Sequence, residues 1–154
     1  MSESLAGDLA RLILRLSGFY LAFGHGLGKV TRLATGDGQG LIDAIGALGF
    51  PAPAIFAWAA ALAELLGGLA IGLGIGIKIA CGFAGFTMAV AAIGQHRAIH
   101  QGFAALGLIS PNERTMEQWG SPEKALLYVL IFGAILLLGP GRFSIGNRLG
   151  KKKG

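Results

Sequence analysis

Long apolar runs separated by short polar stretches dominate the chain. A helix needs about 20 apolar residues to cross the roughly 30 Å hydrocarbon layer of a bilayer. Four runs approach that length, at about 9–28, 54–75, 77–99 and 124–139. The last run is the shortest and stops at Pro140, whose ring cannot continue a helix. The pattern predicts an all-α membrane protein built as a four-transmembrane-helix bundle.

The composition supports a membrane location. Of the 154 residues, 53% are hydrophobic and 14% are charged, and the mean hydropathy is +0.64, whereas soluble domains carry about 25% charged residues. The four runs leave little chain for a soluble module, so we expect residues 1–154 to form a single integral membrane domain. The single Cys81 excludes an intramolecular disulfide and a CxxC redox pair.

The distribution of lysine and arginine predicts how the bundle is inserted. Four crossings place both termini and the turn at Lys78 on one side of the membrane, together with a basic tail at 141–154. Basic loops are enriched on the cytoplasmic side, so both termini are predicted to be cytoplasmic. The first run contains Arg15 and lacks a small-residue cleavage site, so we expect it to be retained rather than removed as a signal peptide.

The two predicted outer loops differ in character. Residues 40–50 space leucine and isoleucine at helical intervals, which predicts a short interfacial helix in the first outer loop. Residues 101–123 contain two prolines and Trp119, a pattern typical of a loop with an aromatic anchor at the membrane surface.

Four ionisable residues lie within or beside the first apolar run: Arg11, Arg15, His25 and Lys29. At about 100° per residue they share one narrow face of a regular helix, and such a face must turn away from lipid. Arg11 and Lys29 lie near the ends of the run, where long side chains can reach the two membrane surfaces. Arg15 and His25 lie deeper and need partners inside the bundle.

Glu64 is the one carboxylate within the four apolar runs. A carboxylate near the middle of a bilayer is expected to pair with Arg15, to contact His25 or to be protonated. Two interpretations stay open. Either a static ion pair between Arg15 and Glu64 fixes the bundle, or Glu64 handles protons or contacts a ligand.

Glycines accompany Glu64 on the second run. Gly67 and Gly68 leave space beside the carboxylate. Gly68, Gly72 and Gly76 follow the small-xxx-small spacing that brings membrane helices into close contact. We interpret these glycines as structural.

His96 and His100 stand four residues apart at the end of the third run, and in one continuous helix they would share a face. Because that helix is predicted to leave the membrane on the outer side, all three histidines of the chain are expected at one end of the bundle. Three interpretations stay open: ordinary interfacial histidines, a quinone, anion or proton site, and a metal or haem site. No Cys, Asp or Glu ligand stands close by in the sequence, so no metal site is assigned.

Three segments in this order resemble the DoxX family of small bacterial membrane proteins: RLILRLSGFYLAFGHGLGK, GFPAPAIFAWAAALAELLGG and LLLGPGRFSIG. The resemblance covers about residues 11–146. The GPGR motif supplies four further residues that are expected to be structural: Gly139, Pro140, Gly141 and Arg142. The family pattern commonly has Asp where this chain has Gly146.

The resemblance implies an inner-membrane bacterial protein related to the membrane subunit of thiosulfate:quinone oxidoreductase. On that basis we expect a subunit of a respiratory or redox complex that binds a quinone and works with a partner that oxidises a small sulfur compound. Glu64 and His25 are the candidate catalytic residues, since both can exchange protons. The candidate ligand-binding residues are Arg15, Lys29, His96 and His100.

No flavin, iron–sulfur or metal site is evident in the sequence, so electrons are expected to come from other membrane or periplasmic subunits. The net charge of +5 is interpreted as a signal for topology and lipid contact, and no nucleic-acid partner is expected. The alternative is a non-enzymatic membrane anchor or assembly subunit of a larger complex. An oligomeric permease is less favoured, because one four-helix unit offers little room for a path.

Overall fold

Every regular element within residues 4–150, the part of the chain described by the computed structural model, is helical. The helices are α1 (Leu5–Leu21), α2 (Leu27–Thr35), α3 (Gln39–Ala47), α4 (Pro53–Leu73), α5 (Ile77–Val90), α6 (Ala98–Ala105), α7 (Glu113–Trp119), α8 (Glu123–Leu138) and α9 (Ile145–Gly150). Two single π-turns, η1 (Ala22–Gly26) and η2 (Ala91–Gln95), continue α1 and α5. The lysines 151–153 of the predicted basic tail lie outside the described residues.

Three stretches of the described chain are long and apolar enough to cross a membrane. They are Pro53–Leu73, Ile77–Gln95 and Glu113–Leu138, and they correspond to the second, third and fourth predicted runs. The first run, at 9–28, forms continuous helix through α1, η1 and α2, but its ionisable residues interrupt the apolar stretch. The all-helical fold is thus confirmed, and the count of four crossings stays a prediction.

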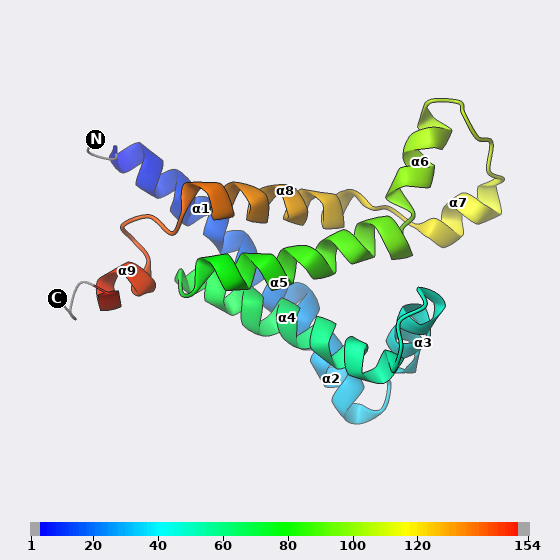
Figure 1. Cartoon of the computed structure of the whole chain (residues 1–154), viewed down its shortest axis with the longest axis horizontal. Helices are drawn as coiled ribbons and strands as arrows, with labels where there is room; N and C mark the ends of the chain where they lie inside the picture. Colours follow the sequence, from blue (N-terminus) through cyan, green and yellow to red (C-terminus); the bar gives the residue numbers. More distant parts are fainter. Residues whose placement is uncertain (1–3, 151–154) are drawn as a thin grey trace.

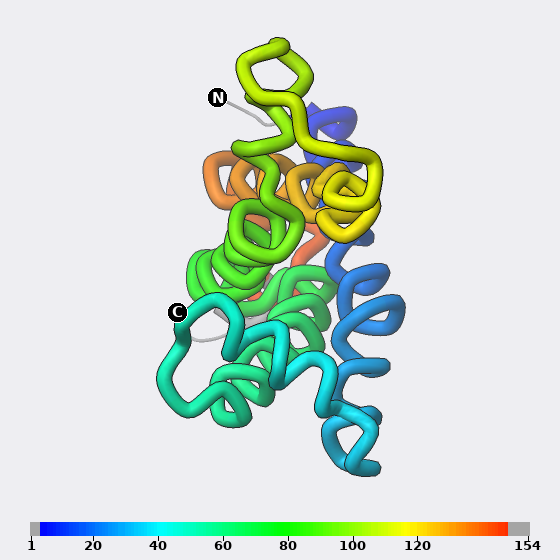
Figure 2. Tube along the Cα trace, turned by 90° about the vertical axis from the view of Figure 1, so that its right-hand side faces the viewer, coloured from blue at the N-terminus to red at the C-terminus, as the bar shows by residue number. Residues whose placement is uncertain are grey.

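The long helices α1, α4, α5 and α8 pack side by side (Figures 1 and 2). Helices α4 and α5 form an antiparallel hairpin whose turn contains Gly74 and Gly76, both with positive φ. Helix α1 packs on α4, and α8 packs on α5 and α1. The start of α1 and the short helix α9 lie at the end of the bundle where α8 finishes (Figure 1).

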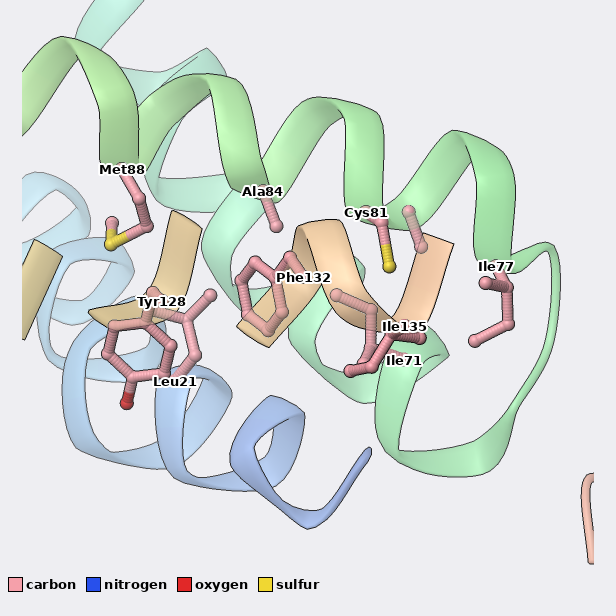
Figure 3. Packing of buried hydrophobic residues seen from close by; sticks show 10 residues of the cluster. Leu21, Ile71, Ile77, Cys81, Ala84, Met88, Tyr128, Phe132 and Ile135 are labelled. Atoms are coloured by element: carbon pink, nitrogen blue, oxygen red, sulfur yellow. The ribbon is translucent and has the colours of Figure 1, made fainter. Parts of the chain in front are cut away.

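The buried apolar core lies where these helices meet. Leu21, Ile71, Met88, Phe132 and Ile135 are all at most 6% exposed and form one cluster (Figure 3). Large apolar side chains also cover the outside of the bundle on α1, α4, α5 and α8. An apolar exterior around a packed core is the arrangement expected of helices surrounded by lipid.

Helices α1 and α4 approach each other at glycine. A Cβ atom added to Gly18 would lie 2.5 Å from the carbonyl oxygen of Gly68, and one added to Gly68 would lie equally close to the oxygen of Gly18. Gly72 extends this contact by packing against the ring of Phe19. The prediction that Gly76 belongs to the same helix contact was wrong. Gly76 lies in the α4–α5 turn, and a Cβ there would meet nothing within 4 Å.

The outer segments are more helical than expected. Helix α3 confirms the short helix predicted at 40–50. The loop predicted at 101–123 was wrong, because it contains the end of α6 and all of α7. The third helix was predicted to reach residue 99, but it ends at Gln95 and the chain turns at Arg97, whose φ is 51°. The Gln101 side chain donates to the carbonyl oxygen of His96 at 2.8 Å, and this bond satisfies an acceptor that the broken helix leaves free.

The glycine contact generates a test. Gly18→Ala should destabilise the folded chain by about 1–3 kcal/mol, because the added methyl group forces the backbones of α1 and α4 apart. Gly28→Ala is the matched control, since nothing lies within 4 Å of a Cβ at Gly28, and alanine is the better helix former by about 1 kcal/mol. Unfolding of both variants in detergent measures the difference. Equal stability would mean that the close approach does not hold the two helices.

Candidate functional site

Glu64 is buried in the middle of α4 and is paired with a lysine. The carboxylate is 1% exposed, and its Oε1 accepts a hydrogen bond from Lys29 Nζ at 2.5 Å. The first of the two interpretations left open for Glu64, an ion pair with Arg15, was therefore wrong. The expected reach of Lys29 to the membrane surface was also wrong, because its ammonium turns inward to the carboxylate.

A glycine contact places the lysine opposite the acid. Gly26 ends η1 and is buried against α4, where a Cβ would lie 2.7 Å from the Cα of Leu65. Lys29 follows one turn later in α2. Because the main chains of the two helices nearly touch at Gly26, the lysine side chain can span the remaining gap to Glu64.

An apolar cavity of about 240 Å³ lies beside this ion pair. Helix α3 contributes Leu41 and Ile45, the residue after it contributes Leu48, and small residues of α4 provide another wall. Phe83 and Phe86 of α5 also line the cavity, although more than 60% of each side chain is exposed. The cavity therefore borders the outer surface of the bundle, where lipid is expected.

The polar groups of the cavity are few, and one of them is incomplete. Glu64 Oε2 is buried and has no hydrogen-bond partner. Thr87 also lines the cavity, but its hydroxyl already donates to the carbonyl oxygen of Ala84 at 2.9 Å. Gln95 and Lys29 complete the polar lining. A carboxylate with one free oxygen can accept a hydrogen bond or a proton from a molecule in the cavity.

Arg15 lies in a different place, at the end of the bundle that holds the chain termini. Its guanidinium donates to the carbonyl oxygens of Pro140 at 2.7 Å and Phe143 at 3.4 Å. Gly74, the C-cap of α4, lies against the same guanidinium, which a Cβ there would approach to 2.5 Å. The buried cation thus lies at the C-terminal ends of α4 and α8, where the helix dipoles favour positive charge.

Sequence reasoning missed Asp8 as a partner at this end. Asp8 is 2% exposed, and its carboxylate accepts from the Arg142 main-chain N–H at 3.0 Å and lies 3.5 Å from Arg11. The spacing of Asp8 and Arg11 by three residues in one helix was the available signal. The GPGR motif thus forms a clasp on α1.

The clasp also accounts for the glycine at position 146. Gly146 donates its main-chain N–H to the carbonyl oxygen of Gly74, and a Cβ at Gly146 would lie 2.6 Å from that oxygen. An aspartate at this position would therefore push the clasp away from the α4–α5 turn.

The histidines do not form one cluster. His96 and His100 lie on opposite sides of the helix break at Arg97, so the predicted shared face was wrong. Both instead contact Trp119. His96 Nδ1 lies 2.9 Å from the main-chain oxygen of Trp119, and the ring of His100 packs on the indole ring with 5.8 Å between the ring centroids.

His25 packs elsewhere, against the rings of Tyr20 and Tyr128. It does not line the cavity beside Glu64. Among the described residues, no group of three or more His, Cys, Asp or Glu side chains is arranged to hold a metal ion.

These features define an α-helical membrane protein with a buried carboxylate–ammonium pair beside an apolar cavity. A family model described as DoxX matches residues 10–97. The chain belongs to the DoxX family. All residues that line the cavity fall within the matched range, whereas the GPGR clasp lies beyond it. Comparisons with curated proteins and with solved structures found no match.

A double-mutant cycle tests the ion pair. Lys29→Gln and Glu64→Gln should show a favourable coupling free energy of about 1–3 kcal/mol, because each single change leaves the other charge without its partner. Unfolding of the full chain in detergent measures the coupling. Lys78→Gln combined with Glu64→Gln is the control and should be additive, since Lys78 lies exposed beside the α4–α5 turn. Additive effects of the first pair would contradict the pairing.

Proposed function

We propose that this chain is a quinone-binding membrane subunit of a respiratory redox complex. One observation carries the proposal: Glu64 lines an apolar cavity, is 1% exposed and keeps one oxygen without a partner. A few convergent polar groups in an otherwise apolar pocket are typical of ligand sites. The family membership agrees with a membrane subunit.

The size and lining of the cavity suit a quinone head group. An apolar cavity of about 150 Å³ holds one benzene ring, so about 240 Å³ admits a substituted ring. A quinone ring is flat and apolar apart from two carbonyl oxygens, and these need donors. Lys29 has N–H groups beyond the one that it gives to Glu64.

Lys29 and Glu64 would have different roles in binding and reducing a quinone. When bound, a quinone accepts two electrons and two protons. Lys29 would donate a hydrogen bond to a carbonyl oxygen of the ring and so fix its orientation. Glu64 Oε2 would hold one proton within reach of the ring, and Lys29 would stabilise the carboxylate after that proton leaves. The same carboxylate would then take up the second proton from water and pass it to the ring. A lipid-soluble molecule would enter past Phe83 and Phe86, which face outward.

A partner must supply the electrons. The resemblance to the thiosulfate:quinone oxidoreductase subunit supports a second membrane or periplasmic protein that oxidises a small sulfur compound. The same resemblance supports the bacterial inner membrane as the location. His25, His96 and His100 have no step in this proposal, because none of them lines the Glu64 cavity.

The topology proposed with this function has four crossings and cytoplasmic termini. The helix from Leu5 to Thr35 packs along α4 through much of its length, which supports a first crossing beside it. Two cations of this helix turn inward: Lys29 is held by Glu64, and Arg15 is held by the carbonyl oxygen of Pro140 in the clasp.

A non-enzymatic anchor is the second candidate. Two observations favour it: Lys29 and Glu64 pair with each other, and Arg15 donates its hydrogen bonds to main-chain carbonyl oxygens. In that case the polar residues fix the register of the bundle, and the cavity has no ligand.

Filling the cavity distinguishes the two candidates. Ala60→Phe should weaken binding of decylubiquinone by at least about tenfold, since Ala60 lines the cavity and a phenyl ring takes the space of the head group. Leu66→Phe is the control, because Leu66 lies on the exposed face of the same helix. Quenching of tryptophan fluorescence in the purified chain measures binding. Equal affinity in the two variants, or no binding by the unmodified chain, would favour the anchor.

The role of Glu64 in proton transfer has its own test. In the complex isolated with its native partners, Glu64→Gln should lower the rate of quinone reduction by about 10²-fold or more, because an amide cannot carry the proton. Assembly of the complex, measured by size-exclusion chromatography, should stay intact. Lost assembly with normal turnover in the remaining complex would instead assign Glu64 to structure.

Labelling of single cysteines tests the topology. In a Cys81→Ala background, Ser4→Cys and Lys78→Cys should react with a membrane-impermeant maleimide only after cells are permeabilised. Ser121→Cys should react in intact spheroplasts. Labelling of Ser4→Cys from outside would show that the first helix does not cross, because Ser4 and Ser121 would then lie on one side.

A further inference from the structure

A second apolar groove lies between α1 and α8. It is lined by Ser17 and Tyr20 from α1 and by Lys124, Leu127, Tyr128 and Ile131 from α8. It shares no lining residue with the cavity beside Glu64. An occupant of this groove need not be the occupant of the cavity, although Tyr128 lies close enough to Glu64 for their polar groups to interact electrostatically.

The groove contains a buried hydroxyl group without a partner. Tyr128 is 7% exposed, and its hydroxyl is buried with no hydrogen bond. Its ring is held between His25 and Phe132. Buried tyrosine hydroxyls usually find an acceptor, so this group points to an acceptor supplied by another molecule. The Ser17 hydroxyl donates to the carbonyl oxygen of Leu14 at 2.6 Å and does not bond Tyr128.

A positive charge marks one end of the same groove. Lys124 is exposed in the first turn of α8, and Tyr128 follows it by four residues, or about 6 Å along the helix axis. Beyond Tyr128 the groove continues along the apolar side chains of Leu127 and Ile131. Along α8 the groove thus presents first the ammonium of Lys124, then the hydroxyl of Tyr128, and then apolar side chains.

This order matches the order of groups in a phospholipid. The head-group region occupies about 5–7 Å on each side of the hydrocarbon layer, which is close to the rise between Lys124 and Tyr128. With the ammonium at the level of the lipid phosphate, the phenol hydroxyl lies at the level of the ester carbonyl groups. Tyrosine and lysine are the side chains that anchor helices at this depth.

We propose that the α1–α8 groove binds one anionic phospholipid. Its phosphate lies on Lys124, an ester carbonyl accepts the hydrogen bond of Tyr128, and an acyl chain lies between α1 and α8. The choice of a lipid rests on charge complementarity at Lys124 and on the unpartnered donor below it. A neutral quinone would leave the lysine without an anion.

Native mass spectrometry of the purified full chain, with phosphatidylglycerol or phosphatidylcholine added in mild detergent, tests the head-group contact. The unmodified chain should retain phosphatidylglycerol about fivefold better, and Lys124→Gln should remove this preference. Lys78→Gln is the matched control, because Lys78 is an exposed lysine at the other end of the bundle. An unchanged preference in Lys124→Gln would overturn the proposal.

The hydroxyl contact is tested with the lipid as well as the protein. Phosphatidylglycerol with ether linkages lacks the carbonyl acceptor, so the unmodified chain should retain it about fivefold less than the ester form. Tyr128→Phe should retain the two forms equally. Equal retention of both forms by the unmodified chain would contradict the assignment. Displacement of the lipid by decylubiquinone would overturn it too, because the groove would then be a quinone site.

Discussion

The close approach of the α1 and α4 backbones is the constraint on which the rest of the structure depends. Gly18 and Gly68 allow the helices to touch through main-chain atoms, and Gly26 repeats the contact against Leu65. Only at this separation can Lys29 reach a carboxylate that is 1% exposed. An unpaired charge in hydrocarbon costs several kcal/mol. The glycines therefore decide whether Glu64 is tolerated in the middle of the bundle.

The level of each cation along α4, together with the π-turn η1, determines which one the carboxylate receives. Gly74 lies beside Arg15, whereas Gly26, one turn before Lys29, packs on Leu65. A regular helix would hold Arg15 and Lys29 on one face, but a π-turn contains one additional residue and rotates all later side chains by about 100°. Arg15, before the turn, faces the carbonyl oxygens of Pro140 and Phe143. Lys29, after the turn, faces Glu64. The two cations of one sequence stripe thus have different partners, Arg15 at the terminal end of the bundle and Lys29 in the middle of α4.

Sequence periodicity could predict the helices but not their partners. Runs of apolar residues locate α4, α5 and α8 to within a few residues, because helix length in lipid is set by hydrophobicity. The Arg15–Glu64 pairing failed because a helical wheel shows which residues share a face but not their level along a neighbouring helix. Arg15 lies beside Gly74, whereas Glu64 lies beside Gly26. The wheel also assumes an uninterrupted repeat, and nothing in AFGHG identifies a π-turn. Asp8 was missed because it precedes the apolar run and finds its partner 134 residues later. Such contacts depend on tertiary structure alone.

The polar groups at the terminal end of the bundle and those beside Glu64 differ in what they leave available for chemistry. At the terminal end, Arg15 and Asp8 are buried and bonded to main-chain groups of the segment from Pro140 to Phe143, so a ligand would have to displace part of the chain. Beside Glu64 the situation is reversed, because the polar groups border a cavity and one carboxylate oxygen is unbonded. A buried polar atom costs free energy unless it gains a partner. Arg15 Nε is also buried without a partner, but the same guanidinium is already held by two main-chain carbonyl oxygens. Glu64 Oε2 instead belongs to a residue that lines an apolar cavity, so its free position is better explained by a ligand site than by a polar core that only fixes the register of the helices.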